Sequence, residues 1–339
     1  MPARLTLFLP HRPARVCALE EGEEYVIGRD PGCAISVADD RISRRHALLR
    51  YDGGWTVREL GSKNGVTVDG RTVQEAALPE RAWLSFGGVL ARFEGLSVEE
   101  AARDTAEHLA RARTSLEMQR QLSPAAGVQA ILGQLLDSVL QLARCRRGFV
   151  LLSDADGELR VAAVRGLAVA DLHEAPFGGS AAAVERALRE ARPVAVSDTA
   201  LDPLLAGRPS VVAGDIRALV AVPLPGRQGP EGVVYADSPE TGAVFTELDV
   251  DILAGLAAHA ALAVAAARLD EELASVLGEL RASPPSGAEL ERLRDELGSP
   301  AGAARPARAA KRATGAPVEA APRWSDVWSR HAAAEGAAR

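Results

Sequence analysis

The sequence predicts a multidomain protein in which an all-β sandwich or barrel precedes a mixed α/β domain. Three observations lead to this fold class. Short alternating apolar runs recur through residues 1–96, helix-like and strand-like segments are mixed through residues 124–270, and globular composition is lost in residues 298–339. Residues 97–123 and 271–297 flank the second domain with helical patterns, so we expect a linker helix and a helical extension there.

Length, charge and cysteine content restrict the class of protein. The 339 residues have room for two domains, and a formal net charge of −7 argues against nucleic acid or an anionic membrane as the main partner. Cys17, Cys33 and Cys145 are too few and too scattered for a disulfide framework or a zinc site, so we expect reduced thiols and no bound metal. No uninterrupted apolar run reaches 18 residues, and the first run is too short for a signal peptide. We therefore expect no transmembrane helix and a cytoplasmic location.

Nine short alternating runs predict the strands of the first domain. Turn residues such as Pro31-Gly32, Asn64-Gly65 and Gly87-Gly88 separate them, as is typical of a sandwich or barrel. The predicted strands cover residues 5–9, 15–19, 25–28, 34–37, 46–50, 55–59, 66–68, 83–86 and 89–93.

A helix is predicted over residues 97–122. Ser97 and Glu100 have the spacing of a capping box at its start. An apolar stripe then recurs in alternating steps of four and three, at Val98, Ala102, Thr105, Leu109, Ala112, Leu116 and Gln119. Two interpretations remain open at this point: the helix pairs with its copy in a dimer, or it rests on a domain as an amphipathic helix.

The second domain alternates helices and strands. Ser180 and Thr246 are predicted N-caps of two of its helices, and the helix after Thr246 keeps a coiled-coil stripe beyond residue 267. That stripe consists of Leu269, Leu273, Val276 and Leu280. The predicted helices are 128–143, 180–191 and the one that starts at 246; the predicted strands are 148–152, 159–164, 193–197, 218–223 and 232–236. The strand 218–223 is apolar enough to be central.

The C-terminal residues have the composition of a disordered tail. Residues 298–323 are rich in Ala, Pro, Gly, Arg and Ser. Trp324 and Trp328 follow, one helical turn apart. We interpret this pair either as a docking motif or as a cover for part of the second domain.

Four polar fragments stand out in predicted loops of the first domain. They are Gly28-Arg29-Asp30, residues 41–46 (RISRRH), Gly61-Ser62-Lys63 and Asn64-Gly65. A phosphate monoester carries about −1.5 to −2 charge and three strong acceptor oxygens. Arg supplies a planar fork of donors, Ser a short donor, Lys a point charge, and Asn a donor and an acceptor for a peptide backbone. Each charge alone is better interpreted as a solvated surface group, but together the fragments indicate a phosphopeptide reader.

The order G-R-D, S-R-R-H and L-G-S-K-N-G-V-x-V-x-G resembles the forkhead-associated (FHA) domain over about residues 3–93. This resemblance implies a β-sandwich that reads phosphothreonine peptides with the loops at one end. By matching position, it implies that Arg29 and Ser43 bind the phosphate, that Lys63 and Arg44 add contacts to it, and that Asn64 holds the peptide backbone. Arg41 is implied to touch the phosphate or a downstream side chain.

Three further residues of the motif are expected to be structural. The resemblance implies that Gly28 lets the chain turn and that His46 forms hydrogen bonds within the loop scaffold. Gly65 is expected to have a positive φ in the Asn-Gly turn.

About residues 125–270 resemble a GAF domain, most clearly at 218–224 (ALVAVPL), 232–237 (GVVYAD) and 245–249 (FTELD). The resemblance implies an antiparallel sheet flanked by helices and dimerisation through terminal helices. Some members of the family bind cyclic nucleotides, haem or bilins, but the charged and cysteine signatures of those members are not evident, so we expect no cofactor. His173 and His259 are interpreted as surface or core residues rather than haem ligands.

We therefore predict a phosphothreonine-dependent signalling adaptor of the bacterial FHA–GAF type. No Walker loop, zinc-protease motif, nucleophile elbow or kinase signature occurs, so we expect no catalytic activity. The expected partner is a phosphothreonine protein of a Ser/Thr kinase pathway, with a homodimer as a second association. The alternative is a small-molecule sensor that acts through the GAF pocket. A degenerate scaffold is a third hypothesis, against which Arg29, Ser43 and Asn64 argue.

Overall fold

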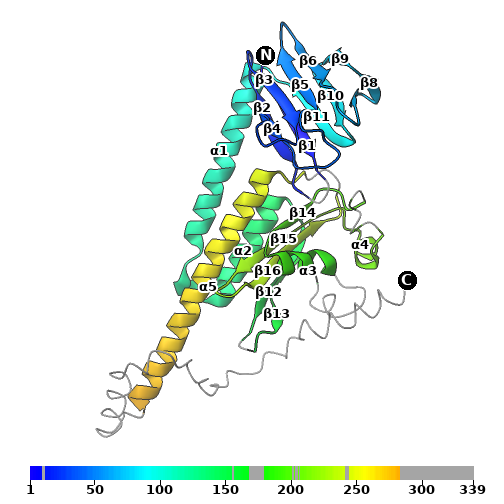
Figure 1. The fold of residues 1–339 in the computed structure, drawn as a ribbon. Coiled ribbons are helices and arrows are strands. Elements are labelled where there is room, and N and C mark those ends of the chain that lie inside the picture. Colours follow the sequence, from blue (N-terminus) through cyan, green and yellow to red (C-terminus); the bar gives the residue numbers. More distant parts are fainter. Residues whose placement is uncertain are drawn as a thin grey trace, which may run out of the picture.

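The computed structural model describes residues 1–282 except 10–11, 155, 168–178, 201, 203–204, 206 and 241–243. Figure 1 shows a β-sandwich formed by the first part of the chain and an α/β domain formed by the second part. The long helix α1 connects them in sequence and runs along one side of the α/β domain. The predicted fold class is confirmed for both domains. The predictions for His173, the disordered tail and the Trp324/Trp328 pair concern residues outside the described part of the chain.

Two sheets face each other in the sandwich. One has the strand order β2-β1-β11-β10-β7-β8 and the other has the order β4-β3-β5-β6-β9. Neighbouring strands are antiparallel, except for the parallel pair β3 and β4. The strands are β1 (Ala3–Phe8), β2 (Arg15–Leu19), β3 (Glu24–Gly28), β4 (Ile35–Ser36), β5 (Ala47–Tyr51), β6 (Trp55–Glu59), β7 (Val66–Val68), β8 (Arg71–Val73), β9 (Glu75–Ala77), β10 (Arg81–Phe86) and β11 (Val89–Gly95).

Alternation along the strands builds the core of the sandwich. On β1, Leu5 and Leu7 point inward and are fully buried, whereas Arg4 lies on the outer face and pairs with Glu94. Apolar residues from both sheets fill the space between them, with Trp55, Phe86 and Phe93 among the large buried side chains. Every predicted strand is present within two residues of its predicted ends, and β8 and β9 are additional.

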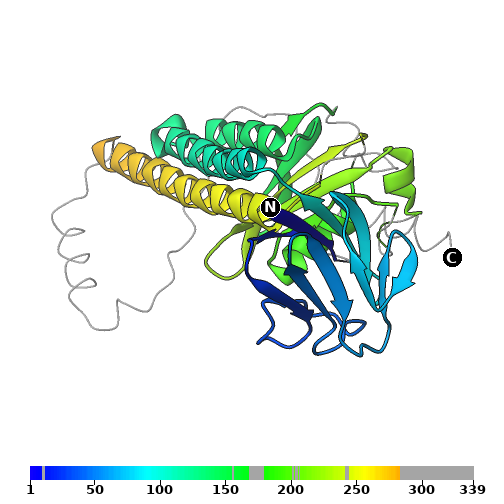
Figure 2. The same cartoon turned by 90° about the horizontal axis from the view of Figure 1, so that it is seen from above.

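The linker helix α1 (Val98–Gln121) starts at the predicted capping box. The Ser97 hydroxyl accepts from the Glu100 N–H at 3.1 Å, and the Glu100 carboxylate accepts from the Ser97 N–H at 2.8 Å. The helix then runs beside the last helix, α5 (Glu247–Ala282), as both views show (Figures 1 and 2). Arg111 of α1 donates to the Asp249 carboxylate of α5 at 2.9 Å. The helix therefore rests on the second domain, although Leu109 and Leu116 stay exposed.

The second domain has one antiparallel sheet of order β13-β12-β16-β15-β14. Its strands are β12 (Arg147–Ser153), β13 (Leu159–Arg165), β14 (Val194–Val196), β15 (Ala218–Pro225) and β16 (Pro230–Ser238). Its further helices are η1 (Pro124–Ala126), α2 (Val128–Ala143), α3 (Ala181–Glu190) and α4 (Pro209–Ala213). Ser180 caps α3 and Thr246 caps α5, as predicted. The apolar strand β15 is an interior strand, beside the central β16.

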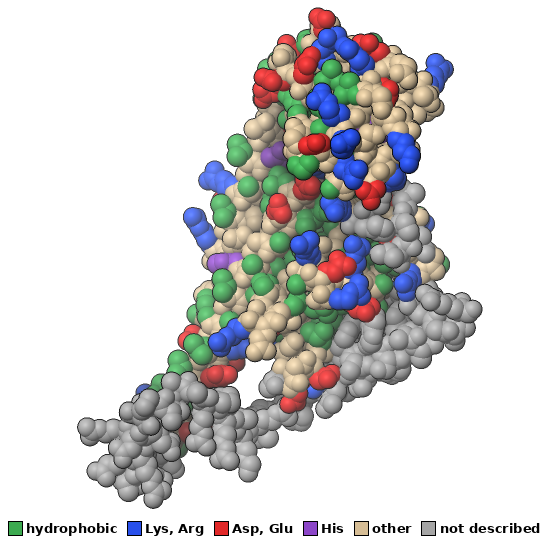
Figure 3. All heavy atoms as spheres, viewed as in Figure 1, with side chains coloured by type: hydrophobic (Ala, Val, Ile, Leu, Met, Phe, Trp, Pro, Cys, Tyr) green, Lys and Arg blue, Asp and Glu red, His purple; other side chains and the backbone are tan. Residues whose placement is uncertain are grey.

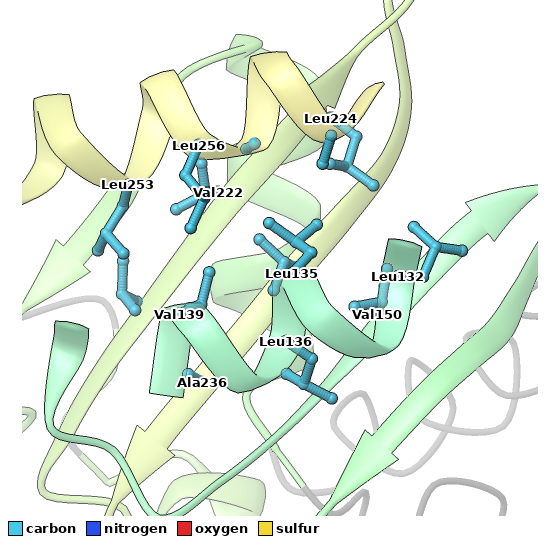
Figure 4. Packing of buried hydrophobic residues seen from close by; sticks show 14 of the residues in the cluster. Leu132, Leu135, Leu136, Val139, Val150, Val222, Leu224, Ala236, Leu253 and Leu256 are labelled. Atoms are coloured by element: carbon cyan, nitrogen blue, oxygen red, sulfur yellow. The ribbon is translucent and has the colours of Figure 1, made fainter. Parts of the chain in front are cut away.

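Helices cover both faces of this sheet. Figure 4 shows α2 and α5 packed on one face, where Leu132, Leu135, Val139, Leu253 and Leu256 meet the strands. On the other face, α3 packs over a second apolar cluster. In that cluster the rings of Phe149 and Tyr235 stack with centroids 4.8 Å apart.

Helix α5 has one face in the core and one face in solvent. Its inner face buries Val250, Leu253, Leu256, Ala257, Ala260, Ala263, Val264 and Ala267. Exposed side chains on it include Leu262, Leu269, Leu273, Val276, Leu277 and Leu280. Within the described part of the chain it is the one helix long and apolar enough to cross a membrane, a test that a core helix of a soluble protein also passes. In Figure 3, hydrophobic side chains are visible at the surface toward the lower left, where α5 runs in Figure 1.

A backbone bridge joins the sandwich to the second domain. The Ala14 N–H donates to the Phe245 carbonyl at 2.8 Å, and the Glu247 N–H donates to the Ala14 carbonyl at 3.0 Å. Ala14 and Phe245 are both buried. Because α5 begins at Glu247, this bridge ties the loop after β1 to the start of that helix. We call it the Ala14 bridge.

Candidate phosphate-binding site

Three loops of the sandwich meet around a hollow of about 590 Å³. The loop after β3 contributes Arg29 and Asp30, the loop before β5 contributes Ser43, Arg44 and Arg45, and the loop after β6 contributes Gly61 and Lys63. The structure therefore brings together Arg29, Ser43, Arg44 and Lys63, which come from three separate fragments of the sequence. Arg45 was not predicted to be part of this site.

Main-chain hydrogen bonds hold the first two loops together. The Arg29 N–H donates to the Ser43 carbonyl at 2.9 Å, and the Asp30 N–H donates to the Arg44 carbonyl at 3.1 Å. Gly28, at the end of β3, makes this close approach possible, because a Cβ there would lie 2.1 Å from the Arg44 carbonyl oxygen. Gly28 ends its strand without a positive φ, directly before the bend at Arg29-Asp30, and its absent side chain gives the two loops the space to meet.

His46 links the second loop to the third. It is fully buried, and its Nδ1 accepts from the Ser43 N–H at 3.1 Å. Since Nδ1 is an acceptor, Nε2 carries the proton and donates to the Gly65 carbonyl at 3.0 Å. Gly65 has φ 73°, and its carbonyl also accepts from the Gly87 N–H at 3.1 Å. His46 and Gly65 thus both take part in the hydrogen bonds that join the second loop to the third.

The third loop is also tied to the second through polar side chains. The Lys63 N–H donates to the Ser43 hydroxyl oxygen at 3.0 Å, which leaves the hydroxyl hydrogen free to donate to a ligand. The Asn64 amide donates to the Arg41 carbonyl at 2.8 Å and is exposed. Asn64 is thus on the rim next to the hollow, where it bridges two loops.

Arg41 points away from the hollow. Its guanidinium forms a bidentate pair with Asp39, at 2.9 and 2.8 Å, and this contact holds the pKa of the Asp39 carboxyl below its usual range. Neither Arg41 nor Asn64 lines the hollow. Their predicted contacts with a phosphopeptide remain predictions.

The charge of the hollow suits a dianion. Four cationic side chains line it, Arg29, Arg44, Arg45 and Lys63, against the single carboxylate of Asp30. Lys and Arg side chains are also prominent over the sandwich on the face shown in Figure 3. All four lining cations are exposed, so they remain hydrated and mobile enough to close around an anion. The arrangement can therefore bind a phosphate group through charge-assisted hydrogen bonds.

A second polar feature lies in the α/β domain. Asp237 on β16 is fully buried, and its Oδ1 accepts from Arg147 Nε at 2.5 Å. Among the described residues its Oδ2 makes no hydrogen bond of ordinary geometry, although the Tyr235 hydroxyl interacts with the carboxyl. Burial raises the pKa of the Asp237 carboxyl. On the same strand, the Tyr235 hydroxyl accepts from the Ser180 N–H at 3.0 Å.

The structure thus has a β-sandwich with a cationic hollow among its loops, joined to an α/β domain. The family model for the FHA domain matches residues 25–87, and the family model for the GAF domain matches residues 125–265. The chain therefore carries an FHA domain followed by a GAF domain. FHA domains are phosphothreonine-binding signalling modules, and GAF domains are sensor modules.

Several known proteins are similar to parts of the chain. The ABC transporter ATP-binding/permease protein Rv1747 of Mycobacterium tuberculosis is 43% identical over 53 residues, which are 15% of this chain and 6% of that protein. The FHA domain of the CT664 protein from Chlamydia trachomatis is 28% identical, with a TM-score of 0.27, over 29% of this chain and 100% of that chain. The GAF domain of the cyanobacteriochrome TePixJ is 22% identical, with a TM-score of 0.35, over 42% of this chain and 91% of that chain. The matched segment thus spans only a small part of the transporter's length.

Proposed function

We propose that this protein is a phosphothreonine-dependent adaptor that recruits a phosphorylated partner through its FHA domain. The observation that carries the proposal is the convergence of Arg29, Ser43, Arg44 and Lys63 from three loops on one hollow. Those side chains supply planar forks, a hydroxyl donor and a point charge, which is the donor set that a phosphate monoester needs.

Ligand binding requires a small exchange of partners. Arg29 Nη1 pairs with the Asp40 carboxylate at 3.2 Å, in a contact where the side chains are 47% and 98% exposed. An exposed pair of this kind contributes little energy, so a dianionic phosphate can replace Asp40 as the partner of Arg29. Asn64 can likewise exchange the Arg41 carbonyl for a peptide carbonyl, because both are main-chain oxygens.

Peptide binding to the full chain tests this role. Fluorescence anisotropy would be measured with a degenerate phosphothreonine library, with phosphoserine and unphosphorylated libraries as controls. Arg29→Ala is expected to lose about 1.5–3 kcal/mol of affinity, the value of one charge-assisted bond. That corresponds to roughly 10–150-fold. The matched variant Arg113→Ala removes an exposed arginine of α1 and should bind like the wild type. Binding that is equal for all libraries, or equal in Arg29→Ala, would reject the assignment.

We further infer that the chain acts in the cytoplasm, downstream of a Ser/Thr kinase, and that it brings partners together rather than catalysing a reaction. We also infer that it forms a homodimer. The dimer is supported by the exposed stripe Leu262, Leu269, Leu273, Val276 and Leu280, whose spacing of seven, four, three and four residues suits a coiled coil. Replacing Leu273 and Leu280 by Glu should convert the dimer into a monomer in light-scattering measurements. An unchanged mass would reject this interface.

Ligand sensing by the GAF domain is the second candidate function. The buried Oδ2 of Asp237 favours it, because this acceptor makes no hydrogen bond of ordinary geometry and a ligand donor would lower the cost of its burial. A nucleotide or chromophore retained by the purified protein would appear in native mass spectrometry or absorbance spectra. Such a ligand should be lost in Asp237→Asn, and its retention there would argue against this site.

A further inference from the structure

The hollow around Arg29 has more positive charge and more space than one phosphate group needs. Four cationic side chains line it against the single carboxylate of Asp30, which leaves a formal charge of +3. A phosphothreonine brings about −1.5 to −2, so about one positive charge remains for another group. The volume of about 590 Å³ lies within the range of about 300–1,000 Å³ that is usual for sites of whole small ligands. A second anionic group can therefore enter beside the phosphate.

Three of the four cationic side chains are available to such a group. The side chains of Arg44, Arg45 and Lys63 form no ion pair or hydrogen bond with any residue that the structure describes. The carboxylate of Asp30 is engaged in its own loop, where Oδ1 accepts from the Gly32 N–H at 2.8 Å. Any counter-charge for these three cations must therefore come from a ligand or from solvent ions.

Main-chain hydrogen bonds place Arg45 to one side of the expected phosphate position. The Ser43 hydroxyl oxygen accepts from the Lys63 N–H at 3.0 Å, and the His46 carbonyl accepts from the Leu60 N–H at 3.0 Å. Arg45 lies between these two contacts, two residues after Ser43. Two residues of extended chain span at most about 7 Å. Arg45 can therefore bind an anion next to a phosphate that Ser43 and Lys63 hold.

The surface beside Arg45 is open and free of acidic side chains from the hollow's other rim. Gly61 follows Leu60, which contacts the residue after Arg45, and a Cβ at Gly61 would meet nothing within 4 Å. The surroundings of Arg29 differ, because its guanidinium pairs with the Asp40 carboxylate at 3.2 Å. An acidic ligand group near Arg29 would meet that like charge. The second anion therefore fits best at Arg45.

We propose that the preferred ligand carries an Asp or Glu two residues from its phosphothreonine and that Arg45 binds this carboxylate. In an extended peptide, side chains two residues apart point to the same side at about 6.5–7 Å, which matches the offset of Arg45 from Ser43. One carboxylate also supplies the single negative charge that remains, whereas a second phosphate brings about −1.5 to −2 and exceeds it. This inference rests on the function proposed above.

The first test compares phosphothreonine peptides of otherwise neutral sequence on the full chain by fluorescence anisotropy. Gln, Glu or phosphoserine would be placed two residues before or two residues after the phosphothreonine. At one of these positions Glu should bind about two- to fivefold more tightly than Gln, the magnitude of an exposed ion pair. Glu directly next to the phosphothreonine points to the other side and is the control, with a gain below twofold. Equal affinity of the Glu and Gln peptides at both positions would overturn the proposal, and tighter binding of phosphoserine than of Glu would overturn the choice of a carboxylate.

The second test changes Arg45. Arg45→Ala should remove the gain from Glu, Arg45→Lys should keep it, and Arg45→Glu should reverse it, so that a peptide with Lys at that position binds more tightly than one with Glu. Arg71→Ala, which removes an exposed arginine of β8 outside the hollow, should keep the gain. A merely structural role of Arg45 would weaken all peptides by the same factor. Persistence of the Glu preference in Arg45→Ala would contradict the assignment.

Failure of this inference is separable from failure of the proposed function. If the neutral phosphothreonine peptide binds and Glu adds nothing, the role of Arg45 is overturned while the reader role stands. If no phosphothreonine peptide binds to the folded protein, with or without Glu, both are overturned.

Discussion

Replacing His46 by alanine tests whether a single buried ring holds the phosphate-binding loops together. The substitution removes the two hydrogen bonds that link Ser43 to Gly65, each contributing about 0.5–1.5 kcal/mol. It also removes an edge-on contact with Phe86, with ring centroids 6.2 Å apart, which contributes about 0.5–1.5 kcal/mol. Together these contacts predict a loss of about 1.5–4.5 kcal/mol in the free energy of unfolding of the sandwich.

Tryptophan fluorescence in urea can measure this loss in the full chain. Trp55 is buried in the core of the sandwich, 6.0 Å from the ring of Phe93, so its emission reports unfolding of that domain. The wild type and each variant would also carry Trp324→Phe and Trp328→Phe, which removes the emission of the two C-terminal tryptophans. The midpoint should fall by the predicted free energy divided by the urea m-value.

An exposed histidine provides the control for this substitution. His108 is exposed on α1, and His108→Ala should leave the midpoint unchanged. Phosphopeptide affinity should also fall in His46→Ala, because the loop carrying Ser43 loses its fixed position relative to the loop carrying Lys63. A midpoint within experimental error of the wild type would refute the view that His46 holds the loops together.

Three further predictions concern a glycine, a thiol and the Ala14 bridge. Gly28→Ala should lower the free energy of unfolding by about 1–3 kcal/mol and weaken phosphopeptide binding, because the new methyl group meets the Arg44 carbonyl. Gly54→Ala, where the added methyl group meets open space, is the control. Equal stability of the two variants would contradict the steric argument. Burial raises the pKa of the Cys145 thiol to about 12, so iodoacetamide at pH 8 should modify it only after unfolding. Since folding raises this pKa, its contribution to stability is complete below about pH 9 and is lost as pH rises toward 12; rapid alkylation of the native thiol would contradict this. Ala14→Pro removes the N–H that donates to Phe245, so small-angle scattering should show a larger radius of gyration, and an unchanged radius would show that the bridge does not hold the domains.

Most strands and helices could be predicted because their residues alternate or repeat with a clear period. The strands β8 and β9 could not, since each has three residues and neither has a buried side chain. The same limit applies to α4, which has five residues. Periodicity needs several repeats before it can be detected, so such short elements are defined by their neighbours in space.

The candidate site was predictable in composition but less so in geometry. The resemblance to the FHA domain pointed to Arg29, Ser43, Arg44 and Lys63, and these four side chains line one hollow. The direction of Arg41 was not predictable, because it follows from the nearby Asp39 carboxylate. Likewise, the role of Gly28 depends on a carbonyl sixteen residues away.

Arg45 and the Ala14 bridge show two further features that the sequence does not predict. Three basic or aromatic side chains follow Ser43 in a row, and the run itself does not reveal that both arginines line the hollow. The Ala14 bridge consists of main-chain atoms from segments more than 200 residues apart. Main-chain contacts of this kind leave no signature in residue type.

The position of the Ala14 bridge also determines which partners can approach the FHA site. Phe8 at the end of β1 pairs with Leu90, next to the Gly87-Gly88 turn, and Gly87 contacts the loop that carries His46. The phosphate-binding loops and the bridge are therefore at the same end of the sandwich, facing the GAF domain. A phosphothreonine on a flat, rigid surface would bring its protein into collision with that neighbouring domain. We expect the FHA site to bind phosphothreonines on projecting tails and loops. The shape of a partner would then limit binding even where the residues next to its phosphothreonine are suitable.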